Sequence, residues 1–243
     1  MRILISQKAP SSLNAFKALE DKYGATLDFY PFFLIEPLSV KEFRSQRINL
    51  ADYTAIVFSS RHAIDAYFKL CEETRFKVPE TMKYFCTTEL VALYLQKHVV
   101  YRKRKIFFGD GTPQSVVALI GPKHKGEKFL ITTSDESKTT TMTSLFEKAG
   151  LDVTVSVMVK SVLQDLSGIN LNDYGALLLY NSYDLKSLRA SFPDFDLSRL
   201  ALISYGRSIA AALKNEGLNV EVEGPAPEIQ SAAKALDIFL SKQ

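Results

Sequence analysis

Short polar residues follow many of the apolar runs in this sequence, at points where a strand would lead into a helix. Serine, threonine, asparagine and glycine leave the backbone N–H groups of a helix N-terminus open, and such groups bind carboxylates and phosphates. The chemistry that this pattern predicts is recognition of an anionic molecule. The residues are Ser59, Ser60, Arg61, Thr87, Thr88, Glu89, Gly109, Asp110, Gly111, Thr112, Thr133, Ser134, Asn181, Ser182, Tyr183, Gly206, Arg207 and Ser208.

Each of these hydroxyl or amide side chains could instead do no more than cap the helix that follows it. Capping is the commoner role for any one residue taken alone. In open parallel sheets, however, ligands bind outside the carboxyl ends of the strands, where such loops gather. The whole set therefore favours a ligand site, with capping as the alternative at each position.

Three other patterns carry weaker chemical predictions. The run YRKRK at 101–105 could contact nucleic acid, but a short unaccompanied run is more typical of a solvated strand or sheet edge. Residues 109–112, GDGT, lack the lysine and glycine spacing of phosphate loops, and Thr112 as N-cap before Pro113 explains them. His62 has no acid partner at a triad spacing, and the sequence holds no GxSxG, GxGxxG or paired-carboxylate motif. A hydrolase or a nucleotide-dependent enzyme therefore has little support.

Composition places the chain among globular proteins. Its 243 residues are 47% hydrophobic and 23% charged, with a net charge of +3, which fits one large or two small domains. Cys71 and Cys86 are far apart and the three histidines are scattered, so neither a disulfide scaffold nor a metal centre is expected. No apolar run reaches the ~18 residues of a membrane helix, and the first residues turn polar too soon for a signal peptide. We therefore expect a cytoplasmic protein.

Apolar runs rich in branched and aromatic residues alternate with helical patterns along the chain. Strands that are apolar throughout and alternate with helices favour parallel sheets covered on both faces. The expected strands span residues 2–6, 54–59, 83–87, 128–132, 174–180, 200–204 and 219–222, and the expected helices span residues 12–23, 61–73, 89–97, 136–149, 184–190, 208–215 and 228–241.

Two segments, 26–36 and 152–162, are longer than the other expected strands. The second alternates apolar and polar side chains, as in an antiparallel ribbon. The sequence also contains an internal echo, that is, a short repeat. The motif Asp-Tyr-x-Ala, followed by three apolar residues, begins at Asp52 and again at Asp173. We interpret the chain as two similar α/β domains, each a parallel sheet flanked by helices, with the second inserted into the first and joined to it by a two-stranded linker. The first domain would comprise 1–30 and 163–243, the second 37–151, and the linker strands 31–36 and 152–162.

Four segments of the chain resemble the uroporphyrinogen-III synthase family, and the similarity spans nearly the whole sequence. They are TAIVFSSRHAIDAYF, KYFCTTELVALYL, FGDGTPQSVVALI and ALISYGRSIAAALKNEGLNV, the last followed by PAPEIQSAAKAL. The resemblance implies two α/β domains that face each other across a cleft. It also implies cyclisation of hydroxymethylbilane to uroporphyrinogen III in haem biosynthesis, with loss of water and inversion of the terminal pyrrole ring.

The same resemblance implies that no metal or organic cofactor takes part. The partner would be the linear tetrapyrrole substrate, neither nucleic acid nor a membrane would be bound, and the chain would act as a monomer. Arg61, Lys160 and Arg207 would attract this polyanion. The substrate-binding residues would be Ser59, Ser60, Arg61, Thr87, Thr88, Gly111, Thr112, Thr133, Ser134, Asn181, Ser182, Gly206, Arg207 and Ser208.

The sequence departs from the family pattern at three places. The family's tyrosine, which can assist departure of the hydroxyl group, falls on Val159 here, and Tyr183 or Tyr205 could substitute for it. A Gly-Pro-Thr-Thr loop becomes Gly-Arg-Ser-Ile at 206–209, and a Ser-Pro pair becomes Asn-Ser at 181–182. The catalytic residue therefore stays unassigned. Two alternatives remain open, a non-catalytic homologue that binds a tetrapyrrole or another polyanion and an unrelated α/β ligand-binding module.

Overall fold

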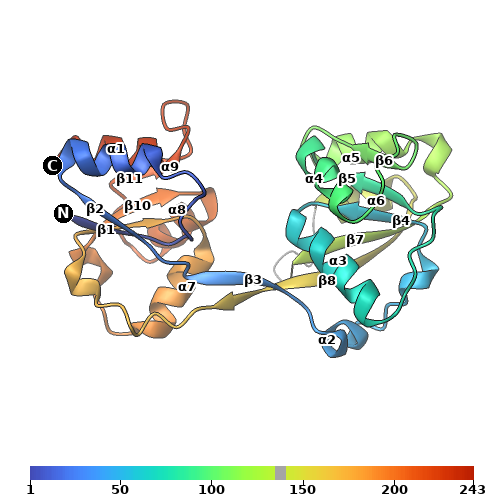
Figure 1. Ribbon diagram of the computed structural model, residues 1–243, viewed down its shortest axis with the longest axis horizontal. Helices are drawn as coiled ribbons and strands as arrows, with labels where there is room; N and C mark the ends of the chain where they lie inside the picture. The colour runs from blue at the N-terminus through green and yellow to red at the C-terminus, as the bar shows by residue number, and fades with distance from the viewer. Residues whose placement is uncertain (135–140) are drawn as a thin grey trace. The chain divides into compact units, whose positions relative to one another are not determined.

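The computed structural model describes residues 1–134 and 141–243. Contacts divide the chain into two compact units: unit 1 comprises residues 1–34 and 162–243, and unit 2 comprises residues 35–161. Each unit is a mainly parallel β-sheet with helices packed on both faces (Figure 1). The α/β fold class expected from the alternation of apolar strands and helices is confirmed.

The sheet of unit 1 is parallel. Helices α1 (Asn14–Tyr23) and α9 (Ala232–Leu240) cover one face, and α7 (Ser182–Ser191) and α8 (Arg207–Asn215) cover the other. The strands lie in the order β11 (Val222–Gly224), β10 (Ala201–Tyr205), β9 (Ala176–Leu179), β1 (Arg2–Ile5) and β2 (Thr26–Phe29).

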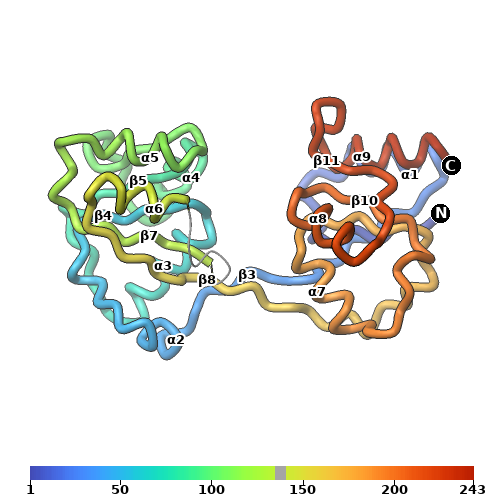
Figure 2. Tube along the Cα trace, turned by 180° about the vertical axis from the view of Figure 1, so that it is seen from behind, coloured from blue at the N-terminus to red at the C-terminus, as the bar shows by residue number. Residues whose placement is uncertain are grey.

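Successive residues of these strands alternate between the two faces. Ile3 and Ile5 pack with α1 and α9, whereas Leu4 packs with α7 and α8. Figure 2 shows α1 and α9 side by side, and Asp237 of α9 accepts hydrogen bonds from Lys22 at 3.0 Å and Tyr23 at 2.8 Å in α1. Helices from opposite ends of the sequence thus cover the same face of the sheet.

The sheet of unit 2 has helices α3 (Arg61–Glu73) and α4 (Glu89–Tyr94) on one face and α5 (Pro113–Ile120) and α6 (Thr141–Lys148) on the other. Its strands lie in the order β3 (Phe33–Pro37), β8 (Asp152–Leu163), β7 (Lys128–Ser134), β4 (Ala55–Phe58), β5 (Lys83–Cys86) and β6 (Ile106–Phe108). The last five strands in this order pair in parallel. The chain also forms α2 (Val40–Ser45) and short 3₁₀ segments at Leu50–Asp52, Leu95–Lys97, Pro122–His124, Leu171–Asp173 and Leu197–Arg199.

The two sheets share one strand order. Unit 2 contains the series β8-β7-β4-β5-β6, and unit 1 contains the corresponding series β2-β1-β9-β10-β11. The repeated Asp-Tyr-x-Ala motif leads into β4 in one unit and into β9 in the other, in each case after a 3₁₀ turn. The internal echo in the sequence therefore marks equivalent strands of two similar units.

The segment 26–36 is two strands rather than the single strand expected. β2 ends at Phe29 and β3 begins at Phe33, and the break contains Pro31, which has no N–H for a continuous ladder. β2 pairs in parallel with β1, so it is a sheet strand of unit 1. β8 is as long as expected, but its residues 152–159 pair in parallel with β7. The assignment of 31–36 and 152–162 as linker strands stays a prediction.

Further expected elements differ in detail; the strand expected at 219–222, for example, forms at Val222–Gly224. Residues 101–105 form a turn before β6 rather than a strand or sheet edge, because the N–H groups of Lys105 and Ile106 both donate to the Arg102 carbonyl oxygen, at 2.8 and 3.1 Å. The helix expected at 136–149 is α6, and residues 136–140 of that expectation lie outside the described residues. Among the helices that the structure describes, none combines the length and apolarity needed to cross a membrane.

An aromatic cluster fills the core on one face of the unit 2 sheet. Phe129 is fully buried, and its ring makes edge contacts with Phe85 (centroids 5.5 Å apart) and Phe146 (5.3 Å). Phe129→Leu should therefore lower the free energy of unfolding by about 1–3 kcal/mol, through lost ring contacts and imperfect packing. Urea unfolding measures this loss. Phe108→Leu, at a ring that is 37% exposed, is the control and should change stability little; equal losses would contradict the packing argument.

Candidate functional site

The polar loops of unit 2 gather at one edge of its sheet. They follow β7, β4, β5 and β6, which are neighbours and parallel, so their carboxyl ends meet at the same edge. Backbone hydrogen bonds hold these loops together: Thr87 N–H donates to Phe58 O (3.0 Å) and Gly111 N–H to Thr87 O (2.8 Å). The structure thus brings together the residues predicted from the sequence in this half of the chain.

Ser60 and Thr88 are the N-caps of α3 and α4. The Ser60 hydroxyl accepts a hydrogen bond from Ala63 N–H at 3.2 Å, and the Thr88 hydroxyl accepts one from Val91 N–H at 3.3 Å. A hydroxyl group that accepts such a bond keeps its own proton for donation, and within the described ranges neither proton has an acceptor. The capping alternative and the ligand prediction are therefore compatible at these two positions, because the cap fixes the oxygen and leaves the O–H available.

Thr112 caps α5 in the same way but has no proton to offer. Its hydroxyl donates to Asp110 Oδ1 at 2.6 Å and accepts from Ser115 N–H at 3.3 Å. The hydrogen bonds from the side chain and N–H of Thr112 hold the pKa of Asp110 below its ordinary value. Gly111 has φ +100°, a conformation that glycine adopts readily. The Thr112 side chain therefore shapes this loop, and we assign it no direct ligand contact.

Ser59, Arg61 and the end of β7 complete this edge. Ser59 and Arg61 are exposed, and the Arg61 guanidinium lies 5.6 Å from the centre of the Tyr94 ring. Thr133 is buried and Ser134 half-buried, and Ser134 pairs with Val159 across a bulge between β7 and β8. The edge therefore offers an exposed cation, Arg61, in the first turn of the helix that Ser60 caps.

A cavity of about 620 Å³ opens at this edge, between the loops that follow β5 and β6. Thr88 and the backbone of Gly109 line it together with two carboxylates, Glu89 and Asp110. A volume of this size suits a small organic ligand. The cavity therefore pairs a hydroxyl donor with carboxylate acceptors.

The polar loops of unit 1 gather at the corresponding edge of its sheet. They follow β1, β9 and β10, which are parallel neighbours. Asn181 caps α7: its Oδ1 accepts from Tyr183 N–H at 3.1 Å and from the Ser182 hydroxyl at 3.3 Å. The Asn181 amide NH₂ group remains a donor.

Gly206 occupies the position before α8, and no side chain caps this helix. A Cβ atom on Gly206 would lie 2.2 Å from the Tyr180 carbonyl oxygen, so the close approach of β9 to this turn requires glycine. Arg207 and Ser208 are exposed in the first turn of α8. The N-terminus of α8 thus presents backbone N–H groups, one hydroxyl group and one guanidinium group.

Sequence reasoning missed a buried carboxylate at this edge. Asp184 is fully buried, and its Oδ2 accepts from the Ser6 hydroxyl (2.6 Å), Tyr180 N–H (2.7 Å) and Asn181 N–H (3.0 Å). Burial raises the pKa of Asp184 although these hydrogen bonds oppose it, and Oδ1 has no partner among the described residues. The Asn-x-x-Asp spacing of a capping box, and the position of Ser6 directly after the first strand, were the available signals.

The residues considered for proton donation lie in different surroundings. Val159 is 5% exposed and belongs to the apolar core of unit 2. Its side chain has no O–H or N–H group, so it cannot donate a proton. Tyr183 packs against Phe33 with ring centroids 5.5 Å apart, and Tyr205 packs against Tyr180 at 5.9 Å, both in unit 1. The structure assigns no catalytic role to either tyrosine.

Lys160, expected with Arg61 and Arg207 to attract a polyanion, has a carboxylate partner. Its ammonium group forms an ion pair with Glu42, and that hydrogen bond, with those from Ser39, lowers the pKa of Glu42 to about 2. The positive charge of Lys160 is therefore balanced by the carboxylate of Glu42. Among the described residues, no group of three or more His, Cys, Asp or Glu side chains is placed to hold a metal ion.

The fold and the two polar edges define a class: an α/β protein of two similar units, each with helix N-termini and hydroxyl groups at the carboxyl ends of a parallel sheet. Within that class, the chain belongs to the uroporphyrinogen-III synthase family. The family's sequence model, described as uroporphyrinogen-III synthase HemD, matches residues 14–234. The family works in porphyrin and haem biosynthesis.

Solved structures with this fold carry the same family name. Uroporphyrinogen-III synthetase from Helicobacter pylori is 17% identical with a TM-score of 0.61, and each chain is covered to 100%. A mutant uroporphyrinogen III synthase from Thermus thermophilus is 17% identical with a TM-score of 0.56, again with 100% coverage of both chains. At this identity the likeness establishes the fold. A sequence search of curated proteins finds no match.

The buried Asp184 should make stability depend on pH. A carboxyl group whose pKa is raised on folding favours the folded state most below its ordinary pKa of 3.8, and this contribution is lost as pH rises through the raised value. We therefore expect the unfolding free energy of the native protein, relative to Asp184→Asn, to fall as pH rises from about 4. Urea unfolding across pH measures this difference. Asp194→Asn makes the same substitution at an exposed position and is the control; a flat difference for Asp184→Asn would contradict the assignment.

The turn at Gly206 should tolerate no side chain. Gly206→Ala is expected to reduce the unfolding free energy by about 2 kcal/mol or more, because a Cβ atom would overlap the Tyr180 carbonyl group. Thermal unfolding followed by circular dichroism checks this. Gly168→Ala, where a Cβ atom meets nothing within 4 Å, is the matched control. An unchanged midpoint for Gly206→Ala would show that this turn is not tightly packed.

Proposed function

We propose that the chain is a uroporphyrinogen-III synthase that closes the linear tetrapyrrole hydroxymethylbilane into uroporphyrinogen III. One water is lost and the terminal pyrrole ring is inverted during closure. The observation that carries this proposal is the family match over residues 14–234. The geometry of both polar edges supports it.

The substrate is a polycarboxylate, and each edge offers donors for carboxylates. In unit 2 these are the O–H groups of Ser60 and Thr88 with the Arg61 guanidinium; in unit 1 they are Arg207 and Ser208 with the N–H groups of the uncapped α8 N-terminus. Charge-assisted hydrogen bonds of this kind are among the stronger ones. We propose that acetate and propionate groups bind at these donors and at the Asn181 amide NH₂ group, and that Ser59, Thr87, Gly111, Thr112, Thr133, Ser134, Ser182 and Gly206 shape the surrounding loops.

The carboxylates near Thr88 have a separate role in this proposal. Glu89 and Asp110 line the cavity at the unit 2 edge and would repel substrate carboxylates, but they can accept hydrogen bonds from pyrrole N–H groups. They would also favour the cationic azafulvene formed when the terminal hydroxyl group departs. The donors of the protein would thus bind the carboxylate groups of the substrate, and its acceptors would bind the pyrrole N–H groups.

No strong nucleophile is required for this reaction. The C–O bond to the terminal hydroxyl group breaks, that group leaves as water after receiving a proton, and the carbon bonds to the α-carbon of the last ring that already carries the neighbouring methylene bridge. The bond between that α-carbon and the bridge then breaks, the bridge bonds to the free α-carbon of the same ring, and this carbon releases a proton. The protein would contribute by holding the chain so that this bridged α-carbon, and not the free one, meets the reactive carbon. Tyr183 and Tyr205 remain the candidates for the proton donor, since Val159 has no hydroxyl group.

One observation favours the alternative, a non-catalytic homologue that binds a tetrapyrrole. Val159 is buried among apolar side chains at the position where the family usually places its tyrosine. A coupled assay with hydroxymethylbilane as substrate separates the two functions. An excess of the type III isomer over the spontaneous type I isomer supports the enzyme, whereas binding without such an excess, from folded protein, supports the alternative.

The Thr88 hydroxyl group should matter for turnover beyond its role as a cap. Thr88→Val is expected to lower kcat/KM for type III product by about tenfold or more, because a hydrogen bond to a carboxylate is lost, whereas Thr88→Ser should retain most activity. The isomer-resolved assay measures both variants. Ser39→Ala removes the N-cap of α2 and serves as the control for lost capping. If Ser39→Ala and Thr88→Val reduced activity equally, Thr88 would have only a structural role.

A further inference from the structure

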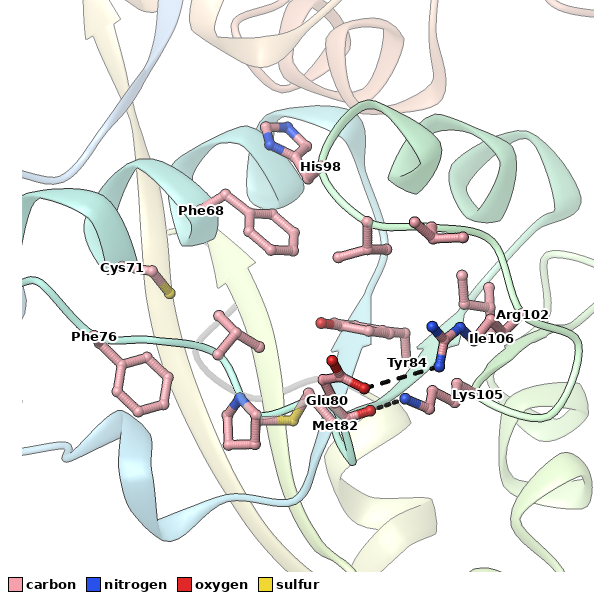
Figure 3. A pocket seen from close by; sticks show the side chains of 14 residues that line it. Phe68, Cys71, Phe76, Glu80, Met82, Tyr84, His98, Arg102, Lys105 and Ile106 are labelled. Atoms are coloured by element: carbon pink, nitrogen blue, oxygen red, sulfur yellow. Dashed lines mark hydrogen bonds and ion pairs between the residues drawn. The ribbon is translucent and has the colours of Figure 1, made fainter.

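A second cavity lies in unit 2, among the segments that lead into β5 and β6 (Figure 3). Its volume is about 420 Å³. Its lining comes from the second half of α3, from residues 76–84 and from residues 98–106. These segments adjoin the amino ends of β5 and β6, whereas the polar loops of the candidate site follow their carboxyl ends. The two cavities of unit 2 therefore have separate linings.

The interior of this cavity is apolar and aromatic. Met82, Tyr84 and Ile106 are each less than 5% exposed and form its inner wall. The half-buried rings of Phe68 and Phe76 complete the lining, and Figure 3 shows the hydroxyl end of Tyr84 directed into the cavity. Small-molecule sites commonly combine such walls with a few polar groups.

The position of the Phe68 ring is fixed. It stacks on the His98 ring with centroids 4.5 Å apart and an interplanar angle of 3°, and His98 Nε2 lies 2.8 Å from Asp65 Oδ1. The Asp65 carboxylate also accepts from the Tyr94 hydroxyl at 2.7 Å. A ring held in this way gives a ligand a flat surface without a large loss of side-chain freedom.

Two cations stand together on one side of the cavity (Figure 3). The Arg102 guanidinium is 4.0 Å from the Glu80 carboxylate, which is 90% exposed, and an ion pair so exposed to water is weak. Lys105 donates to the backbone oxygen of Glu80 rather than to its carboxylate. Two positive charges thus face one carboxylate, which leaves one positive charge for an anion.

The turn at residues 101–105 explains this placement. Its hydrogen bonds to the Arg102 carbonyl oxygen fold the basic run back, so that Arg102 and Lys105 line the cavity while Lys103 and Arg104 do not. A strand or a sheet edge would instead have placed alternate residues on one side. The basic run at 101–105 has no role in the proposed function, and it supplies the charged side of this cavity.

We propose that this cavity binds an amphipathic monoanion, a small organic molecule with an aromatic or aliphatic body and a single carboxylate or sulfonate group. The body occupies the space between Phe68, Tyr84 and Met82, and the anionic group pairs with Arg102 and Lys105. A nucleic acid would need an extended basic surface rather than an apolar interior with one net charge at its side.

The test compares two probes that differ by their charge, 8-anilinonaphthalene-1-sulfonate and the neutral N-phenyl-1-naphthylamine, titrated into the full-length protein. We expect one sulfonate probe per chain, bound more tightly than the neutral probe. Arg102→Gln should weaken sulfonate binding by about three- to fivefold, the magnitude of a partly exposed ion pair, and leave the neutral probe unchanged. Arg104→Gln removes the same charge from the same turn outside the cavity and should change neither.

The proposal would be overturned by no stoichiometric binding of the sulfonate probe, by equal affinities for both probes, or by equal effects of Arg102→Gln and Arg104→Gln. Weakening by Arg61→Gln in place of Arg102→Gln would place the probe at the candidate site and would also overturn it. Thermal unfolding of each variant verifies that it is folded. Arg102→Gln should leave formation of the type III isomer unchanged, so the outcome is independent of the proposed function.

Discussion

Burial of both faces of a parallel sheet is the constraint on which this structure depends. A strand covered by helices on both sides must consist almost entirely of apolar residues, and its polar connections are displaced to the two ends. Because all strands of the matching series run in one direction, the loops that lead into helices collect at the carboxyl edge. Polar residues far apart in the sequence, such as Thr87 and Gly111, become neighbours for this reason alone.

The same constraint explains why capping and ligand recognition coincide. Each helix after a strand needs partners for its first N–H groups, so Ser60, Thr88 and Asn181 are held by the helices that they cap. Their remaining O–H or NH₂ groups are held at fixed positions as donors. At Thr112 the hydroxyl proton is instead donated to Asp110. Thr112 and Thr88 have the same side chain, but only the Thr88 hydroxyl group can donate to a ligand.

The amino edge of unit 2 has a different character because the loops there lead from helices into strands. The two connections that line the cavity, residues 76–82 and 98–105, begin no helix, and the cavity takes its polarity from single side chains such as Arg102, Lys105 and Glu80. A donor-rich edge and an apolar cavity with one net charge suit different ligands. One sheet thus offers two distinct chemical environments at its two ends, a consequence of strand direction.

The sequence alone determined the fold class, because short apolar runs such as residues 2–6 and 54–59, and the polar residues that cap the helices after them, are local signals. It also indicated the internal repeat, because the motif Asp-Tyr-x-Ala leads into an equivalent strand in each unit, β4 and β9. Only the tertiary structure decided which hydroxyl groups keep a free proton, that Lys160 is paired with Glu42, and that Asp184 is buried beside Ser6. The last two properties depend on neighbours more than a hundred positions away, and sequence periodicity carries no information about such distances.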